Sequence, residues 1–156
     1  MLAVSRPSIG KDELNAIKSI FNSGWLGMGA VTYEFEEKIK SYIGAKHVIA
    51  TNTGTNAIHL ALDSYDIKKG DEVIVPSLTY AASIQAILLT GATPVFSESR
   101  TSDLSIDVED VKDRITKRTR AIMPVHYCGK SCDMDELLDI ADSKNIIIIE
   151  DAAHAF

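Results

Sequence analysis

The sequence predicts an α/β fold, a mostly parallel sheet with helices on both faces. From residue 46 on, short β-rich segments alternate with segments whose apolar residues recur at helical spacing, which is typical of parallel sheets with right-handed crossovers. The run Ile146-Ile-Ile-Ile149 is apolar without alternation, as expected of a central strand buried on both faces. With 156 residues, 46% of them hydrophobic and 24% charged, the chain is long enough for one globular domain.

A helical arm is predicted ahead of the sheet. Helices are expected over residues 11–23 and 32–43, where apolar residues recur at helical spacing. Each is followed by a glycine, Gly24 or Gly44, which suits the left-handed position that ends many helices. We therefore divide the chain into an N-terminal helical arm, residues 1–45, and the first part of a sheet domain, residues 46–156. The sheet domain is expected to be cut short, because the chain ends directly after a strand and its exit loop.

The predicted strands and helices of the sheet domain alternate along the chain. The last helix begins near Asp133 and has Glu136 three residues on, a spacing that predicts a capping box. Strands are expected over residues 47–51, 72–75, 93–96, 120–125 and 146–150, and helices over residues 55–65, 81–90, 108–115 and 134–143.

Charge and hydropathy exclude several classes of function. The formal net charge is −6, from 22 acidic and 16 basic residues, and the basic residues are scattered, which argues against nucleic acid as a partner. No apolar run approaches the roughly 20 residues that span a bilayer, and the N-terminus lacks a basic region followed by an apolar one. The sequence therefore predicts a cytoplasmic protein without a membrane partner.

The cysteines raise the question of a metal site. Cys128 and Cys132 lie four residues apart, with His126 just ahead of them. Known zinc sites need paired short spacings and four ligands, and the sequence has no second pair. We expect two free thiols and no metal.

A small polar loop is the first candidate for chemistry. Thr51-Asn-Thr-Gly-Thr-Asn56 lies between a predicted strand and a predicted helix, where free backbone N–H groups and the helix dipole favour an anion such as phosphate. The loop lacks the GxxxxGK[ST] pattern, and the glycines at positions 24, 27 and 29 lack GxGxxG spacing. A plain helix cap is the alternative reading.

Two further candidates follow predicted strands. Asp151 comes directly after the most hydrophobic strand, so it is expected at the carboxyl end of the sheet, where it could bind a metal, orient a base or pair with a ring nitrogen. A solvated strand end or a helix cap is the alternative; the magnesium strand of phosphate-loop ATPases is disfavoured because the matching loop is absent. Tyr80 could stack on a flat ligand, although a core or rim tyrosine is the alternative.

Taken together, the three candidates describe one ligand. An anion cradle, an aromatic ring and a carboxylate are all expected at the carboxyl ends of strands of one sheet. They suit a flat, phosphorylated cofactor with a ring nitrogen, pyridoxal 5'-phosphate (PLP). A carboxylate beside that nitrogen favours the protonated ring that acts as an electron sink.

The sequence resembles the DegT-type sugar aminotransferases, which are PLP-dependent enzymes of fold type I, the aspartate aminotransferase-like fold. The motifs that carry the resemblance run through nearly the whole chain in order. They are Ser23-Gly-Trp-Leu-Gly-Met-Gly29, Phe35-Glu36, Thr53-Gly-Thr-Asn-Ala57, Gly70-Asp-Glu-Val-Ile-Val-Pro76, Thr79-Tyr80, Gly91-Ala-Thr-Pro-Val-Phe96, Pro124-Val-His126, Asp133-Met134 and Glu150-Asp-Ala-Ala-His-Ala155.

The resemblance implies a role for each matching residue. Residues of the polar loop would hold the cofactor phosphate, Tyr80 would stack on the pyridine ring, and Asp151 would pair with its nitrogen. His154 stands where many relatives carry glutamine near the ring hydroxyl. The phosphate would be held by backbone N–H groups of Gly54, Thr55 and Asn56 and by the Thr55 hydroxyl, and the sugar site, often that of the partner subunit, would lie near Trp25, Leu26 and Gly29.

The resemblance also implies the reaction. Such enzymes move an amino group from an amino acid, by family habit L-glutamate, to a keto group on a nucleotide-linked sugar, and they act as homodimers in surface polysaccharide or related sugar biosynthesis. This chain departs from the family pattern at Phe96-Ser-Glu-Ser-Arg100, where relatives typically read Phe-Val-Asp-Ile-Asp.

The lysine that anchors the cofactor belongs to a later part of family members, and no lysine here matches its position. The chain alone therefore contains no catalytic residue of its own and is expected to be inactive. An inactive fragment or interaction module, or a regulatory protein that keeps the fold, are the alternative readings.

Overall fold

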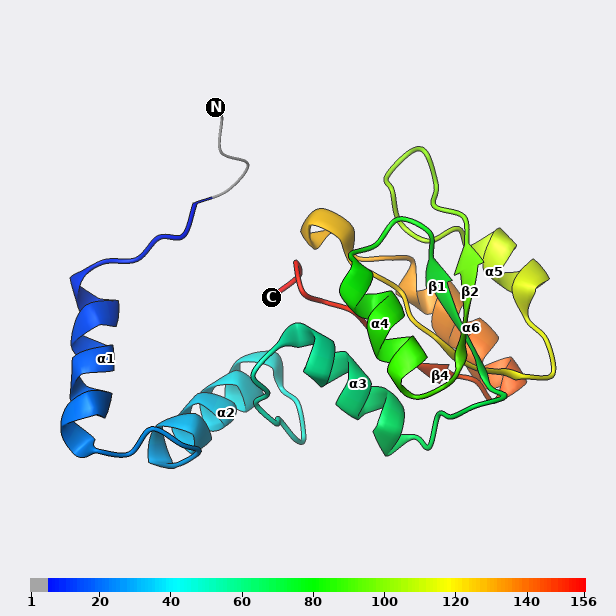
Figure 1. Ribbon diagram of the computed structural model, residues 1–156. Coiled ribbons are helices and arrows are strands. Elements are labelled where there is room, and N and C mark those ends of the chain that lie inside the picture. Colours follow the sequence, from blue (N-terminus) through cyan, green and yellow to red (C-terminus); the bar gives the residue numbers. More distant parts are fainter. Residues whose placement is uncertain (1–5) are drawn as a thin grey trace. The chain divides into compact units, whose positions relative to one another are not determined.

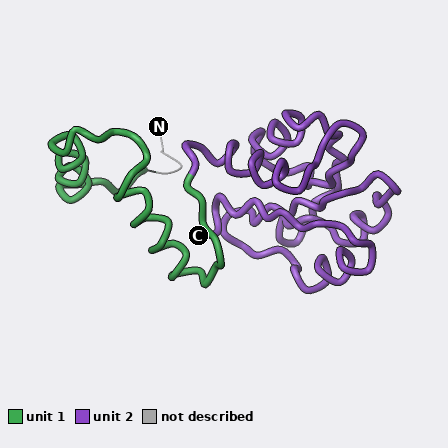
Figure 2. The backbone as a smooth tube through the Cα atoms, turned by 90° about the horizontal axis from the view of Figure 1, so that it is seen from below, with its two compact units in different colours: residues 1–50 green, residues 51–156 purple. Residues whose placement is uncertain are grey.

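A computed structural model describes residues 6–156 (Figure 1). The chain forms two compact units, residues 1–50 and residues 51–156 (Figure 2). Residues 1–5 of the predicted N-terminal arm lie outside the described residues.

The first unit contains the two predicted helices, α1 (Lys11–Ser23) and α2 (Ala30–Ile43). Gly24 and Gly44 both have a φ of 71° and a left-handed conformation, so the prediction that glycine ends each helix is confirmed. No residue of either helix is buried in the described chain, and the apolar residues Leu14, Ile17 and Phe21 of α1 are exposed. The apolar face of α1 is therefore open.

The predicted strand over residues 47–51 is wrong. The segment has no regular secondary structure, Ile49 is exposed, and the amide of Ala50 donates to the Glu36 carboxylate at 2.8 Å. A strand forms only where a neighbouring strand takes up its backbone hydrogen bonds. Within residues 6–156, none pairs with this segment.

The second unit is built on a four-stranded parallel sheet. Its strands are β1 (Glu72–Pro76), β2 (Thr93–Ser97), β3 (Thr119–Ile122) and β4 (Ile147–Ile148), in the order β2-β1-β3-β4. An isolated parallel bridge between Val125 and Asp151 continues the β3–β4 pairing beyond both strands. The carboxyl ends of β1, β3 and β4 therefore lie side by side at one edge.

Helices cover both faces of this sheet. On one face Val73 and Val75 of β1 share a core with residues of α3 (Gly54–Ser64) and α4 (Ala81–Leu89), such as Leu62 and Ile87. On the other face Ile74 shares a core with residues of α5 (Val108–Arg114) and α6 (Met134–Lys144). Adjacent residues of a strand point to opposite faces, and all of β1 is buried. The predicted fold class is confirmed.

The predicted capping box of α6 is wrong. Asp133 precedes the helix but its side chain makes no capping hydrogen bond. Glu136 instead accepts from Lys112 of α5, with 2.8 Å between Nζ and Oε1. The carboxylate joins the two helices on this face of the sheet, and it makes no hydrogen bond to the amide that a capping box would use.

No helix within residues 6–156 is both long and apolar enough to cross a membrane.

Candidate functional site

A pocket of about 330 Å³ opens at the carboxyl edge of the sheet, where the loops that follow β1, β3 and β4 meet. Its lining includes Tyr80 from the first loop, His126 from the second, and Asp151 and His154 from the third. Parallel strands bring residues that are far apart in the sequence to one edge, which is where open α/β sheets place their ligands. The fold thus brings Tyr80, Asp151 and His154 together.

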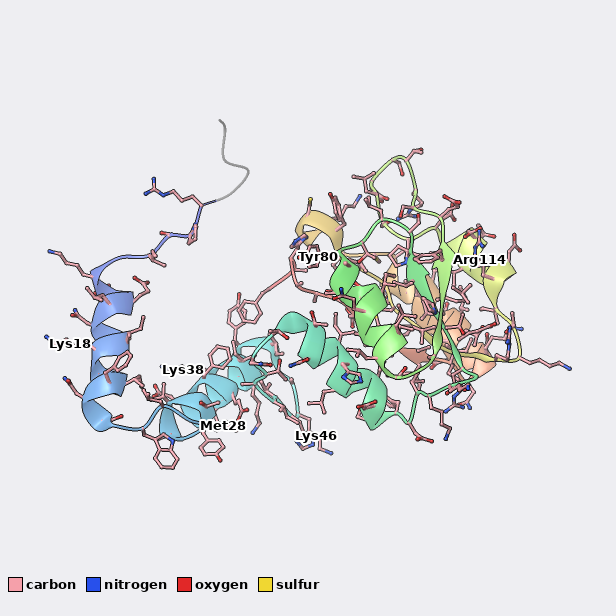
Figure 3. The ribbon with its side chains drawn as sticks, in the orientation of Figure 1. Lys18, Met28, Lys38, Lys46, Tyr80 and Arg114 are labelled. Carbon is pink, nitrogen blue, oxygen red and sulfur yellow. The ribbon has the colours of Figure 1, made fainter. Side chains whose placement is uncertain are left out.

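Tyr80 lies at the start of α4 (Figure 3). It is the N-cap residue of that helix, and 80% of its surface is exposed. A core role, which the sequence left open, is therefore wrong. The side chain presents an uncovered aromatic face beside the pocket, as stacking on a flat ligand requires.

Asp151 is held in place by hydrogen bonds on both carboxylate oxygens. Only 7% of the residue is exposed. The buried Ser83 hydroxyl donates to Oδ2 at 2.7 Å, and the Ala153 amide donates to Oδ1 at 3.3 Å. A carboxylate has about four acceptor positions, so these bonds leave it able to accept from a ligand. Asp151 is an oriented acceptor at the wall of the pocket.

His154 faces the same pocket, and one of its ring nitrogens is already occupied. The amide of Cys128 donates to Nδ1 at 3.3 Å. When the ring is neutral, Nε2 therefore carries the proton and is a donor. Tyr127 meets the His154 ring edge-on, with 6.1 Å between ring centroids. At Gly129, where φ is 81°, an added Cβ would come within 3.1 Å of the His154 carbonyl oxygen.

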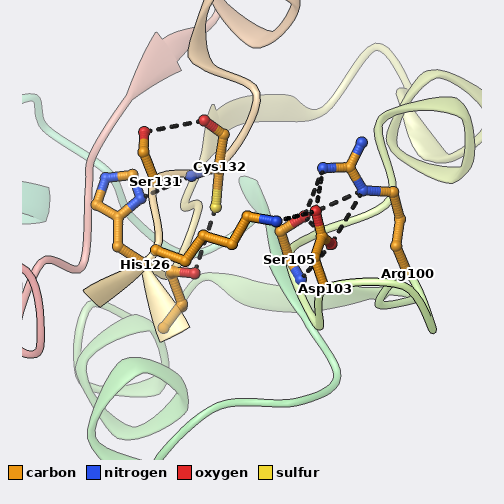
Figure 4. A network of polar contacts seen from close by, with 8 residues as sticks. Arg100, Asp103, Ser105, His126, Ser131 and Cys132 are labelled. Atoms are coloured by element: carbon orange, nitrogen blue, oxygen red, sulfur yellow. Dashed lines mark hydrogen bonds and ion pairs between the residues drawn. The ribbon is translucent and has the colours of Figure 1, made fainter. Parts of the chain in front are cut away.

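His126, by contrast, belongs to the framework of the site. It is 5% exposed, and its Nδ1 accepts from the Cys132 amide at 3.1 Å (Figure 4). Its Nε2 lies 2.7 Å from the Glu150 carboxylate. The Cys132 thiol donates to the Val125 carbonyl, and burial raises its pKa. These contacts fold the segment after β3 into a closed loop.

The segment Phe96-Ser-Glu-Ser-Arg100, which departs from the family pattern, contributes to a polar network (Figure 4). Arg100 pairs with Asp103 at 3.0 Å, Lys130 pairs with the same carboxylate at 2.9 Å, and the Ser105 hydroxyl donates to it at 2.7 Å. The Ser105 and Lys130 donors hold the pKa of Asp103 well below its usual range. The carboxylate thus joins the segment after β2 to the segment after β3.

The predicted phosphate loop forms the first turn of α3. Thr53 is the N-cap, and its hydroxyl oxygen accepts from the Asn56 amide at 3.1 Å. The amides of Gly54 and Thr55 have no hydrogen-bond partner in the described chain. Asn56 lines a separate pocket of about 350 Å³. The first turn of α3 therefore contains both a helix cap and two free amides. The phosphate role of Gly54, Thr55 and Asn56 stays a prediction.

The residues predicted near the sugar lie in the first unit. Trp25, Leu26 and Gly29 line a pocket of about 580 Å³ within that unit. The indole N–H of Trp25 donates to the Met28 carbonyl at 2.8 Å, and a Cβ at position 29 would come within 2.6 Å of the indole nitrogen. Glycine is therefore needed there for this position of the indole. The contact of these residues with a sugar stays a prediction.

Sequence reasoning missed Ser83 and Thr79. Ser83 is fully buried and bonds Asp151, and its oxygen lies 2.7 Å from the Thr79 hydroxyl. A signal was present, because Ser83 is a small polar residue in the otherwise apolar first turns of α4, Ala81-Ala-Ser-Ile84. A buried hydroxyl normally has a hydrogen-bond partner. The identity of that partner, 68 residues along the chain, could not be read from the sequence.

Comparison with known proteins gives consistent matches along the whole chain. The family model described as DegT/DnrJ/EryC1/StrS aminotransferase family matches residues 7–156. Spore coat polysaccharide biosynthesis protein SpsC of Bacillus subtilis is 42% identical over 154 residues, which are 99% of this chain and 40% of SpsC. GDP-perosamine synthase of Caulobacter vibrioides is 43% identical over 155 residues, which are 99% of this chain and 42% of the synthase.

Solved structures of similar proteins agree with this family match. The crystal structure of NtdA from Bacillus subtilis with bound cofactor PMP is 33% identical, with a TM-score of 0.88 over 90% of this chain and 32% of NtdA. The chain spans about 40% of the length of the curated relatives named above.

Proposed function

Because the chain belongs to the DegT/DnrJ/EryC1/StrS aminotransferase family, we propose that the protein that carries it is a PLP-dependent sugar aminotransferase. It transfers an amino group from an amino acid, L-glutamate by the family resemblance, to a keto group on a nucleotide-linked sugar. Its product serves surface polysaccharide or related sugar biosynthesis, a role supported by the names of SpsC and GDP-perosamine synthase.

The observation that carries this proposal is the pocket at the carboxyl edge of the sheet. An oriented carboxylate, Asp151, and an uncovered aromatic side chain, Tyr80, line the same pocket. These residues fit PLP, whose flat ring needs a stacking surface and whose nitrogen needs an acceptor. The PMP bound to NtdA, the aminated form of this cofactor, supports the same group.

Each residue has a defined task in this proposal. PLP, when bound, supplies an electron sink for the bonds at the amino-bearing carbon. Asp151 accepts a hydrogen bond from the protonated ring nitrogen, and Tyr80 stacks on the ring. The Nε2–H of His154, whose Nδ1 is occupied by the Cys128 amide, donates to the ring hydroxyl. At the start of α3 the free amides of Gly54 and Thr55 and the Thr55 hydroxyl bind the phosphate, and Asn56 completes that turn.

The residues that we assign to the sugar substrate belong to the first unit. Trp25, Leu26 and Gly29 line its pocket and would lie near the sugar in a cytoplasmic homodimer. The exposed apolar side chains of α1, such as Ile17 and Phe21, support association, because open apolar faces are commonly covered by a partner. The division into a helical arm, residues 1–45, and the first part of the PLP-binding domain, residues 46–156, is part of this proposal.

The anchoring lysine is not among the residues that line the pocket with Asp151 in the described chain. By the family resemblance it lies further along the sequence of the intact protein. We therefore expect residues 1–156 on their own to bind the cofactor without turning over substrate, because the covalent anchor and proton carrier of the reaction is missing.

The experiment compares two proteins, the product of the complete gene and residues 1–156. Each is titrated with PLP to measure cofactor binding. Each is then incubated with PLP, L-glutamate and a panel of nucleotide-linked keto sugars, and the amino sugar is detected by mass spectrometry. The proposal predicts an amino sugar from the gene product and none from residues 1–156. Absence of any aminated product together with absence of PLP binding would favour an interaction or regulatory module.

A further inference from the structure

We propose that Thr79 and Ser83 form a chain of hydroxyl groups that positions the Asp151 carboxylate for the cofactor's ring nitrogen. This inference rests on the proposed function, because it concerns how the same pocket holds its carboxylate. Both residues act through Asp151, so they are positioning residues, and Thr79 also lines the pocket.

Both contacts are short; the one between Ser83 and Asp151 is buried, and the one between Thr79 and Ser83 is part-buried. Ser83 lies in the first turn of α4 and is fully buried. Its Oγ is 2.7 Å from Asp151 Oδ2 and also 2.7 Å from Thr79 Oγ1. Hydrogen bonds to a charged partner are stronger than those between neutral groups, and burial removes competition from water.

The direction of the chain follows from the number of protons. An ionised carboxylate is only an acceptor, so Ser83 must give its single hydroxyl proton to Asp151. Ser83 Oγ can then only accept from Thr79, whose 2.7 Å contact with Ser83 is much shorter than its 3.4 Å contact with the Tyr80 carbonyl. The order is therefore Thr79 to Ser83 to Asp151.

This arrangement fixes the carboxylate in a useful orientation. Ser83 holds Oδ2, while Oδ1 has only the longer bond from the Ala153 amide, at 3.3 Å. The torsion that turns the carboxylate plane is otherwise soft. Because Oδ2 is held, the plane of the carboxylate is fixed and its free lone pairs point in a fixed direction. A ring N–H needs an acceptor with such a fixed direction.

The same turn of α4 also carries the stacking residue. The Ser83 amide donates to the Tyr80 carbonyl at 3.2 Å, and Thr79 precedes Tyr80 directly in the chain. The aromatic ring and the hydroxyl chain are thus built on adjacent backbone. A change in the start of α4 would shift both contacts to the cofactor together.

The test uses the complete gene product and PLP labelled with ¹⁵N at the ring nitrogen. Two quantities are measured, the dissociation constant for PLP and the ¹⁵N chemical shift, which reports protonation of the ring. The variants are Ser83→Ala, Ser83→Thr and Thr79→Val. Thr90→Val is the matched control: it makes the same change at the other end of α4, where the hydroxyl donates to the Ile87 carbonyl.

We expect Ser83→Ala to weaken PLP binding roughly tenfold, the effect of losing one hydrogen bond to a charged group, and to move the ¹⁵N shift towards the unprotonated ring. Thr79→Val should move both quantities in the same direction by less. Ser83→Thr should restore the shift, and Thr90→Val should change neither quantity.

Wild-type affinity and ¹⁵N shift retained in folded Ser83→Ala would overturn the hydroxyl chain while leaving the proposed function intact. If Ser83→Ala does not fold, Thr79→Val decides by the same criterion. Failure of the wild-type protein to bind PLP would instead overturn the proposed function, and this inference with it.

Discussion

At the scale of single residues, Ser99 lowers the stability of the fold. Its hydroxyl is buried and has no hydrogen-bond partner in the described chain, and a buried polar group without a partner costs about 1–3 kcal/mol. We expect Ser99→Ala to raise the free energy of unfolding by about 1 kcal/mol. Urea unfolding followed by circular dichroism measures this, with Ser64→Ala as the control on an exposed position. A lower stability for Ser99→Ala would show that the hydroxyl has a partner in solution.

Asp110 makes stability depend on pH. The Arg114 guanidinium, helped by the Glu98 amide and the Ser97 hydroxyl, lowers its pKa from 3.8 to about 2. Because the folded pKa lies below the unfolded one, the stabilisation is fully present above pH 3.8 and is lost as the pH falls towards 2. We expect Asp110→Asn to cost about 1 kcal/mol at pH 7, the loss of charge-assisted bonds.

The measurement is the difference in urea midpoint between wild type and Asp110→Asn at pH 7 and at pH near 3. The difference should shrink at the lower pH, because the wild-type carboxylate then binds protons in the unfolded chain. An equal difference in urea midpoint at both pH values would mean that the charge of Asp110 does not stabilise the folded state. Asp142→Asn, on the exposed side of α6, should show no dependence of this kind.

The candidate site illustrates what residue patterns can and cannot predict. Asp151 and Tyr80 both lie in segments that follow strands, so the sequence places them at one edge of the sheet, and the structure brings them to one pocket. Ser83 was not predicted, because its partner is decided by how α4 packs on the sheet. The residues near positions 83 and 151 do not by themselves predict that these two side chains are in contact.

At the scale of elements, the first turn of α3 separates two roles. Thr53 caps the helix through the Asn56 amide, whereas the half-buried Thr55 makes no side-chain hydrogen bond in the described chain. We expect Thr53→Ala to lower the free energy of unfolding by about 1 kcal/mol, the usual cost of a lost cap. Thr55→Val should leave stability nearly unchanged and weaken PLP binding several-fold.

Thermal unfolding and PLP titration of both variants test this separation, and Thr53→Ser serves as the control that keeps the cap. If Thr55→Val lost as much stability as Thr53→Ala and bound PLP normally, the turn would be a structural cap alone. The alternative reading of this loop would then hold.

Most elements of the fold could be predicted because their signals are local. The spacing that predicts each helix, and the apolar runs that predict β1 and β4, are each contained in a short stretch of sequence. The segment 47–51 has β-rich composition but no neighbour within residues 6–156 to pair with. Glu136 has the right spacing for a cap but forms an ion pair with Lys112. Both predictions were wrong because a tertiary partner, absent in one case and present in the other, decided the outcome.

At the scale of the whole molecule, the core of the second unit is self-contained. Its two apolar clusters, one on each face of the sheet, consist of residues between Ile58 and Ile149. Residues 51–156 expressed alone should therefore show the circular dichroism of an α/β protein and unfold cooperatively. Residues 1–50 alone should not, since no residue of α1 or α2 is buried in the described chain. A non-cooperative transition for residues 51–156 would contradict this independence.

The central claim is that the pocket at the carboxyl edge of this sheet holds PLP through Asp151. The most direct measurement is the dissociation constant for PLP of the complete gene product, compared between wild type and Asp151→Asn, with Asp142→Asn as the control. The account predicts saturable binding that Asp151→Asn weakens at least about tenfold, because the ring N–H then loses its charged acceptor. Equal affinity of wild type and Asp151→Asn, with both proteins folded, would contradict it.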